Sequence, residues 1–371
     1  MTGAAFLGRM GAVMSSSLNA PQSSEILRIG MPAGSLADPN RGGNLPRLLE
    51  QAGFRTSGYQ TGGPSKFTTV GFLYGWDGRP QEFATQLGIG ELDVAIAGDD
   101  WIRERVLELK LEYGRTLELR RVMALGRGGV RLVGIARPER EWASARDFFK
   151  DLGSRKPLIT AVAEMPYLAL EWITRRMEEV GLGQAFARFA VQKYAAPAKI
   201  EQGILIYETW GKTEAKVKNG GADLGLEITQ SGSAIKSYGL AIIDEVMESG
   251  TSIWVNPAIR EQPAKLEILR MFLLNLYGAI NAENKVLLLF NVPLAQAAAV
   301  EAYLQRNNLF ADEPSRISGQ AYAEYSIQVD TADPAQPLAR IRYDLAVLGA
   351  RGIDTIPLTS AIPTIGVIDT W

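Results

Sequence analysis

The chain of 371 residues contains no cysteine and no histidine. Without cysteine there is no disulfide framework, no thiol nucleophile and no thiolate metal site. Without histidine there is no imidazole base, no Ser-His-Asp triad and no histidine-ligated zinc. Any chemistry of this chain must therefore use carboxylates, lysine, tyrosine, hydroxyl groups, backbone amides or a hard cation held by oxygen ligands.

Strong net charge and long apolar runs are also missing. The net charge is −2, which gives no reason to expect a nucleic-acid partner. No apolar run approaches the ~18–20 residues that cross a bilayer, so we expect no membrane partner and a cytoplasmic location. Hydrophobic residues make up 46% of the chain and charged residues 22%, which is typical of a globular protein. The length allows two or three domains.

The segment 220–257 contains the most informative loop of the sequence. Leu224–Glu227 is an apolar run ending in an acid, and the polar loop 229–233 (TQSGS) follows it. A strand, a loop of glycine and hydroxyl residues and the start of a helix form an anion site, because N–H groups and hydroxyls point at one spot. The carboxylate of Glu227 lies where it could accept hydrogen bonds from sugar hydroxyls or hold a metal ion. The alternative is a Ser/Gly loop that only turns a corner.

The order of these residues resembles the substrate loop of the ATP phosphoribosyltransferase family, the first enzymes of histidine biosynthesis. That family has an acid, two residues, then Ser/Glu-Thr-Gly-x-Thr-Leu and a turn ending in Asn-Gly-Leu. Here Glu227 stands where the family usually has Asp, and Tyr238–Leu240 forms the exit of the turn. The resemblance implies that phosphoribosyl diphosphate is bound by Thr229, Gln230, Ser231, Gly232, Ser233 and Ala234. Ala234 lacks the hydroxyl that the family has at its position.

The first strand, expected at Ile26–Met31, leads into a glycine loop. In the family this strand ends in Pro-Lys-Gly-Arg-Leu, and its Lys and Arg help to hold nucleotide or phosphates. The chain has Ala33 and Ser35 at these two positions, which is its most serious departure from the family. The resemblance places ATP at Gly34 and Ser35, and Arg41 could supply the missing charge.

Two further segments carry the resemblance in the first half of the chain. Phe72–Pro80 is expected between a strand and a helix. The family's Arg-x-x-Asp-Ile-Pro element falls here, with its acid at Asp77. The alternative is a glycine-punctuated turn. Residues 91–100 (ELDVAIAGDD) form a buried strand bounded by acids and match Asp-Leu-Gly-Ile-x-Gly-Glu-Asp closely. Ligands bind outside the carboxyl ends of such strands. The resemblance therefore assigns Asp77, Gly98 and Asp99 to ATP.

Arginines are concentrated between residues 119 and 132. The segments Leu119-Arg120-Arg121 and 128–132 (GGVRL) match the family's Leu-Arg-Arg and Gly-Gly-x-Arg-Leu. Guanidinium groups match phosphate oxygens, so Arg120, Arg121, Arg127 and Arg131 could grip polyphosphate. Arg131 is assigned to ATP. The alternative is a set of solvated surface arginines.

The second half of the chain continues the resemblance. Pro157–Ala163 is expected to be a strand that precedes a helix at 169–180, and no role is assigned to 192–210. Gly211-Lys212-Thr213-Glu214 matches Gly-Ser-Val-Glu, which makes Glu214 a carboxylate of the catalytic cleft beside Glu227. The alternative for Glu214 is a solvated helix residue among lysines. After 284, a β-α-β-β-α-β order predicts a ferredoxin-like domain, similar to the histidine-binding regulatory domain of long-form family members.

The expected domains are a tail, two lobes and a small domain. Residues 1–24 are interpreted as a disordered tail or alternative start, with a transit peptide as the alternative. Residues 25–115 with 244–283 are expected to form catalytic lobe I, 116–243 lobe II and 284–371 the regulatory domain. The predicted fold is α/β, with two periplasmic-binding-protein-like lobes and a C-terminal ferredoxin-like α+β domain.

The resemblance implies a transferase that joins N1 of ATP to C1′ of phosphoribosyl diphosphate and releases diphosphate. It also implies Mg²⁺ as cofactor, bound in part by Glu227, feedback inhibition by histidine, and homo-oligomers in which dimers form hexamers. Two alternatives stay open. The altered loop at Ala33 and Ser35 would also suit a paralogue that senses an amino acid, or a phosphoribosyltransferase that uses a different nucleophile.

Overall fold

The computed structural model describes residues 24–38, 43–59, 64–309 and 315–369. The expectations for the N-terminal tail and for Arg41 lie outside these residues. Contacts divide the chain into two compact units. The first contains the N-terminal part up to Leu45 and residues Ser57–Leu266, and the second contains Pro46–Thr56 and Glu267–Trp371. No helix among the described residues is long and apolar enough to cross a membrane.

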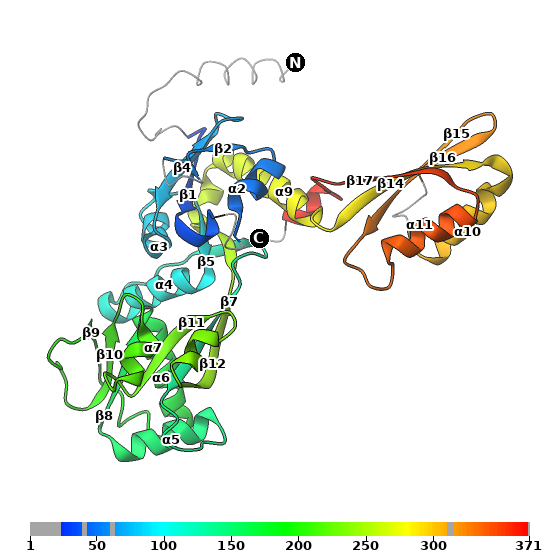
Figure 1. The fold of residues 1–371 in the computed structure, drawn as a ribbon. Helices are drawn as coiled ribbons and strands as arrows, with labels where there is room; N and C mark the ends of the chain where they lie inside the picture. Colours follow the sequence, from blue (N-terminus) through cyan, green and yellow to red (C-terminus); the bar gives the residue numbers. More distant parts are fainter. Residues whose placement is uncertain (1–23, 39–42, 60–63, 310–314, 370–371) are drawn as a thin grey trace. The chain divides into compact units, whose positions relative to one another are not determined.

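Lobe I of the first unit is built on a five-stranded sheet in the order β4-β1-β5-β13-β6 (Figure 1). Its strands are β1 (Leu27–Pro32), β4 (Leu73–Gly78), β5 (Val94–Gly98), β6 (Arg120–Ala124) and β13 (Thr251–Val255). β1 runs parallel to β4 and β5, so the carboxyl ends of these three strands share one edge. Helices α3 (Pro80–Gly88) and α4 (Asp99–Tyr113) follow β4 and β5 directly. The segment Phe72–Pro80, which was expected as a link, is therefore mostly strand β4.

Lobe II is built on a six-stranded sheet in the order β12-β7-β11-β8-β10-β9. Its strands are β7 (Val130–Ala136), β8 (Leu158–Ala163), β9 (Phe189–Lys193), β10 (Gly203–Glu208), β11 (Leu224–Thr229) and β12 (Ala241–Ser249). Its helices are α5 (Ala145–Arg155), α6 (Pro166–Glu179), α7 (Thr213–Lys218) and α8 (Ser233–Ser237). β8 to β11 are parallel and β7 is antiparallel to its neighbours. Helices on both faces explain why these strands read as continuous apolar runs.

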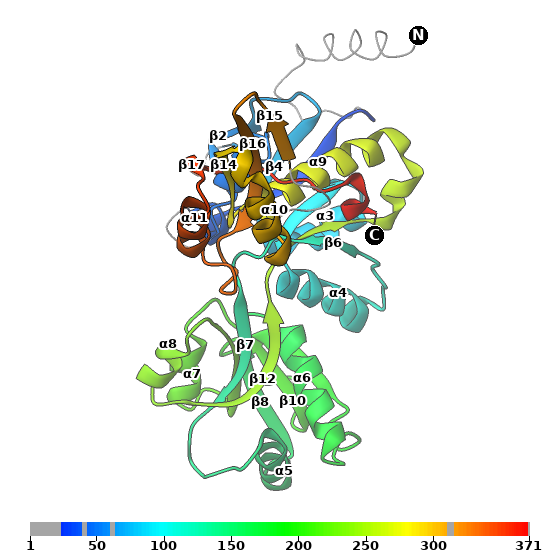
Figure 2. The ribbon, with the colours of Figure 1, turned by 90° about the vertical axis from the view of Figure 1, so that its right-hand side faces the viewer.

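The chain crosses between the two sheets twice. It leaves lobe I after β6 and returns through Gly250, and Figure 2 shows β7 and β12 running side by side below this crossing. The sequence predicts lobe boundaries near residues 115 and 243. In the structure β6 pairs with β13 in lobe I and β12 pairs with β7 in lobe II, so both boundaries lie later in the chain. Apolar periodicity predicts that a strand exists but not which sheet it joins. Residues 192–210, left without a role, contain most of the edge pair β9 and β10.

The second unit contains a four-stranded antiparallel sheet in the order β15-β16-β14-β17. Its elements are α2 (Leu45–Gln51), most of α9 (Pro263–Asn281), β14 (Lys285–Pro293), α10 (Ala297–Arg306), β15 (Ser315–Ser318), β16 (Tyr322–Asp330), α11 (Leu338–Val347) and β17 (Arg351–Pro357). This strand order is that of a ferredoxin-like fold. Residues of β16 alternate between a buried and an exposed face, as expected for a sheet covered on one side.

A buried ion network fixes the start of lobe I. Asp93 accepts hydrogen bonds from Arg28 Nε at 3.1 Å and from Lys265 Nζ at 2.7 Å. The backbone N–H of Arg28 donates to the same carboxylate at 2.8 Å. Both the Asp93 and Lys265 side chains are buried, so the charges compensate one another away from water. The network joins β1, the turn before β5 and the first turn of α9.

Because Asp93 compensates two cations, we expect Asp93→Asn to lower the free energy of unfolding by about 3 kcal/mol. Urea denaturation at neutral pH measures the change. The control is Glu50→Gln, which breaks an ion pair with Arg55 between two exposed side chains. That pair should contribute less than about 0.5 kcal/mol. Equal losses in the two variants would contradict the assignment.

Candidate active site

The loop between β11 and α8 is closed by its own hydroxyl groups. Gly232 adopts a left-handed φ of 74° and its N–H donates to Thr229 Oγ1 at 2.8 Å. The N–H of Ser233 donates to Ser231 Oγ at 3.3 Å, and the two serine hydroxyls are 3.0 Å apart. The side chains of Gln230, Ser231, Ser233 and Ala234 are exposed. The structure therefore brings all six predicted loop residues together in one tight, accessible turn.

A small cavity adjoins this loop at the carboxyl edge of the lobe II sheet. Its lining residues are Leu132, Glu164, Met165, Thr213, Leu226, Glu227 and Ile228. Leu226 pairs in register with Ala163, so Glu227 and Glu164 follow partnered residues on the neighbouring parallel strands β11 and β8. The parallel register is the reason that two glutamates far apart in the sequence share one space.

The electrostatics of this cavity are dominated by crowded carboxylates. Burial, and after it the negative charge of Glu214, raise the pKa of Glu227 to about 7. The Thr213 hydroxyl and the Ile228 N–H, which lies 3.2 Å from Glu227 Oε1, act in the opposite direction. The negative charge of Glu214 therefore acts on Glu227 from the start of α7. Such a group of shifted carboxylates is typical of a functional site.

Two acids that the sequence analysis did not single out complete the group. Burial raises the pKa of Glu164, and the charge of Asp100 raises it further. Asp100 is buried in the first turn of α4 in lobe I, and burial raises its own pKa as well. The carboxyl edges of β8 and β5 therefore lie close to each other. The signal that could have identified Glu164 is its place directly after the predicted strand 157–163.

The lobe I candidates lie at the carboxyl edge of their sheet. Asp77 is the penultimate residue of β4 and is exposed. Its carboxylate accepts from the N–H of Ser65 at 2.8 Å and from the Ser65 hydroxyl. Gly34 follows β1 with φ at 87° and open space around it, and Ser35 lies in the same short 3-10 helix. Gly98 and Asp99 lie at the junction of β5 and α4. The shared edge follows from the parallel pairing of the three strands.

Asp99 makes two hydrogen bonds within lobe I. Its Oδ1 accepts from Trp254 Nε1 at 3.0 Å and its Oδ2 from Arg121 Nη1 at 2.9 Å. The Arg121 side chain is otherwise exposed. Arg131 lies opposite Thr229 in the β7–β11 register and forms an ion pair with Glu245. The arginines expected to act as one cluster are therefore divided between the lobes.

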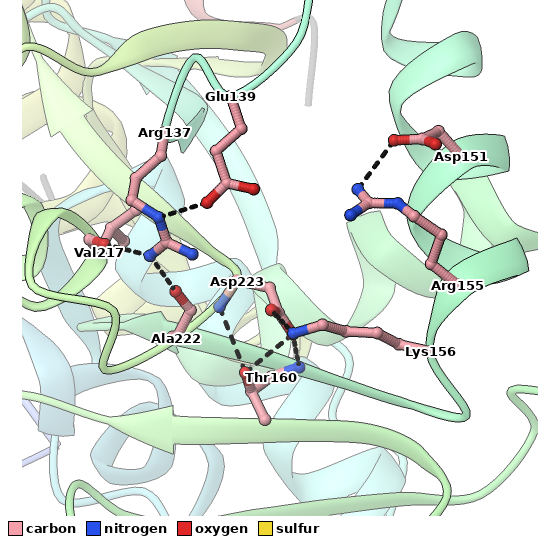
Figure 3. Close-up of polar contacts among 9 residues, drawn as sticks. All are labelled: Arg137, Glu139, Asp151, Arg155, Lys156, Thr160, Val217, Ala222 and Asp223. Carbon is pink, nitrogen blue, oxygen red and sulfur yellow. Dashed lines mark hydrogen bonds and ion pairs between the residues drawn. The ribbon is translucent and has the colours of Figure 1, made fainter.

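A second cavity lies at the amino ends of β8 and β11, the opposite edge of the same sheet (Figure 3). Each of its cations has a partner: Arg137 Nε donates to Glu139 at 2.8 Å, Arg155 to Asp151 at 2.8 Å, and Lys156 forms an ion pair with Asp223. The Arg137 guanidinium also holds two backbone carbonyls. Since these pairs neutralise the cations, the crowded acids mark the first cavity as the better candidate.

Comparison with known proteins identifies the family. A family model described as HisG, ATP phosphoribosyltransferase, matches residues 79–275. The chain belongs to the ATP phosphoribosyltransferase family. An ATP phosphoribosyltransferase of Trichlorobacter lovleyi is 27% identical over 353 residues, which cover 91% of this chain and all of that protein. That of Nitratidesulfovibrio vulgaris strain DP4 is 30% identical over 289 residues, covering 76% of this chain and 82% of the relative.

Among solved structures, the ATP phosphoribosyl transferase (HisG:HisZ) complex from Thermotoga maritima matches with 17% identity and a TM-score of 0.45. The match covers 68% of this chain and 98% of that chain. Membership of the family confirms the predicted enzyme class. The chain is a pentosyltransferase of the first step of histidine biosynthesis, with ATP and phosphoribosyl diphosphate as substrates, and the sensor alternative is not favoured.

The raised pKa of Glu227 predicts how stability depends on pH. The folded chain keeps a proton on Glu227 up to about pH 7, whereas an unfolded glutamate loses it near its ordinary value of 4.5. The free energy of unfolding therefore falls as pH rises through this window. We expect Glu227→Gln to be more stable than the parent at pH 8, by on the order of 1–2 kcal/mol, with little difference at pH 5.

Urea denaturation of both proteins at the two pH values measures this difference. The exposed Glu201, between β9 and β10, supplies the control variant Glu201→Gln, for which the difference from the parent should not change with pH. A Glu227→Gln variant that loses stability at pH 8 would show that the carboxylate is held by favourable contacts.

Proposed function

We propose that phosphoribosyl diphosphate binds at residues 229–234 with its 5-phosphate on the loop and its ribose beside Glu227. The observation that carries the proposal is the tight Gly232 turn directly following a half-buried carboxylate. Backbone N–H groups and the hydroxyls of Ser231 and Ser233 supply the donors that a phosphate requires. We assign Glu227 and Glu214 to the ribose.

The chemistry needs no protein base, because N1 of adenine carries a free lone pair. This nitrogen forms a bond to C1′ while the bond from C1′ to the diphosphate oxygen breaks, and diphosphate leaves with the electron pair. Positive charge develops on the ribose in between. Carboxylates fixed beside the ring stabilise that charge electrostatically, and the two lobes hold the reactants in line. Glu227 and Glu214 are the groups that we assign to this task.

Mg²⁺ fits this site as a partner of the substrate. The described residues include no group of three acids placed to hold a metal by themselves. Mg²⁺ commonly needs only one or two carboxylates together with substrate phosphates. Burial and, after it, neighbouring negative charges raise the pKa of Glu227 and Glu164. A cation would favour the ionised form of both groups, so we assign it to these two side chains and the diphosphate. When bound, the ion would neutralise charge on the leaving group.

ATP is proposed to lie at the lobe I edge, near Gly34, Ser35, Asp77 and Gly98, with Arg131 reaching it from lobe II. Asp99 is engaged by Trp254 and Arg121, so we assign it the task of orienting the Arg121 guanidinium toward the triphosphate. A guanidinium is suited to phosphate oxygens. This cation would replace part of the charge that the family has at the positions of Ala33 and Ser35.

Regulation and assembly rest on the family resemblance. We propose that histidine binds the ferredoxin-like domain as an inhibitor and that the enzyme assembles as homo-oligomers, with dimers forming hexamers. A cytoplasmic location accords with a biosynthetic enzyme of this class.

The substrate loop can be tested with a matched pair of glycines. Gly232 and Gly239 flank α8, and both have positive φ, 74° and 69°. Gly232→Asp places a negative charge where the phosphate would bind, and we expect at least a ~100-fold loss of kcat/KM for phosphoribosyl diphosphate. Gly239→Asp imposes a similar backbone strain outside the loop and should stay within about threefold of the parent. Equal effects, measured as phosphoribosyl-ATP formation, would refute the loop assignment.

The coupling between Glu214 and Glu227 predicts a pH effect on catalysis. If ionised Glu227 is needed, the acidic limb of kcat/KM should lie near pH 7, because this profile reports the free enzyme. Glu214→Gln removes a negative neighbour, which lowers the pKa of Glu227 and moves the limb to lower pH. The profile of Glu201→Gln serves as the control. A limb that stays in place or moves to higher pH would contradict the coupling.

A further inference from the structure

Helix α6 starts without a cap of its own. Its N-cap residue, Met165, makes no capping hydrogen bond with its side chain, and the first helical residue is Pro166. The first N–H groups that need an acceptor therefore belong to Tyr167 and Leu168. Both residues are buried, so water cannot readily serve as the acceptor.

The missing cap is supplied by the other lobe. Glu104, on α4 of lobe I, accepts from the N–H of Tyr167 with Oε1 at 2.9 Å and from the N–H of Leu168 with Oε2 at 2.7 Å. Glu104 is only 6% exposed. Burial raises its pKa, and the two amide donors counteract part of the rise because they favour the charged form. A carboxylate at a helix N-terminus is also favoured by the helix dipole.

Helix α4 belongs to lobe I and also contacts lobe II beside the candidate active site. Its first turn carries Asp99 and Asp100, and Trp101 and Leu107 pack against the core of lobe II. At the other end of the contact, Glu164 lies two residues before Pro166. The contact between Glu104 and α6 therefore joins the helix that carries Asp99 and Asp100 to the helix that follows Glu164.

We propose that Glu104 is a positioning residue that latches α6 of lobe II to α4 of lobe I and so sets the separation of the two halves of the active site. The proposal rests on the proposed function for its effect on catalysis. In two-lobed folds joined by a pair of crossing strands, the lobes can rotate about the crossing. A buried capping contact between lobes restricts this rotation, because breaking it exposes two unpaired N–H groups and a carboxylate.

The first test is Glu104→Gln, which keeps the size of the side chain but replaces one acceptor oxygen with a donor. We expect kcat to fall ~10-fold or more, because small misplacements of reacting groups are costly. The dissociation constant of phosphoribosyl diphosphate should change less than about threefold, since residues 229–234 belong to lobe II alone. A merely structural role would lower the melting temperature and leave kcat of the folded enzyme unchanged.

The matched control is Glu171→Gln. Glu171 lies on α6 and pairs with Arg103 of α4 at 2.6 Å, so it joins the same two helices through exposed side chains. Such a pair contributes little, and this variant should stay within twofold of the parent in kcat.

The second test measures the lobes directly and does not depend on activity. Because the chain has no cysteine, Ile89→Cys in lobe I and Lys150→Cys in lobe II, both exposed positions, give two unique sites for spin labels. We expect one narrow distance distribution in the labelled parent and a broader or second distribution after Glu104→Gln. A change in kcat without a change in the distances, or the reverse, overturns the inference. A parent that makes no phosphoribosyl-ATP would refute the proposed function, while the distances would still test the latch.

Discussion

Two neighbouring parallel strands, β8 and β11, end side by side, and each delivers a glutamate to the same half-buried space. The proximity of Glu164 and Glu227 follows from strand register, and Glu214 adds a third negative charge nearby. The folded chain holds these charges at a cost in stability, and the cost decreases when a cation or an electron-poor sugar lies among them. In a chain without histidine or cysteine, partly buried carboxylates are the side chains of this cavity that can stabilise a developing positive charge.

Local features of the site could be predicted from the sequence, whereas its long-range contacts could not. The loop 229–234 depends on a strand, a glycine and hydroxyl side chains that are adjacent in the chain, and the structure places them together. Strands β5, β8 and β11 were likewise visible as apolar runs. The partners of Asp99 and Arg131, and the sheet that β6 joins, depend on residues over twenty positions away. Glu164 directly follows the predicted strand 157–163, but only the pairing of β8 with β11 places it beside Glu227.

The departure of the first loop from the family affects charge more than shape. Gly34 keeps the open, left-handed turn after β1, while Ala33 and Ser35 bring no cation to it. Exposed cations of lobe I lie directly after β4, at Arg79, and on β6, where Asp99 holds Arg121. A guanidinium anchored on one side by a carboxylate loses less conformational freedom when it meets a phosphate. The sheet edge can therefore present positive charge without the family's loop residues.

The double crossing at 125–129 and at Gly250 makes lobe II one continuous insertion between two paired strands of lobe I. Ala124 and Ser252 are partners in the β6–β13 pair, so the insertion begins and ends at almost the same place. A segment with adjacent ends can be replaced by recombination without breaking the host sheet. Lobe II, to which we assign the phosphorylated sugar, is thus a module that can be exchanged while the sheet of lobe I stays intact.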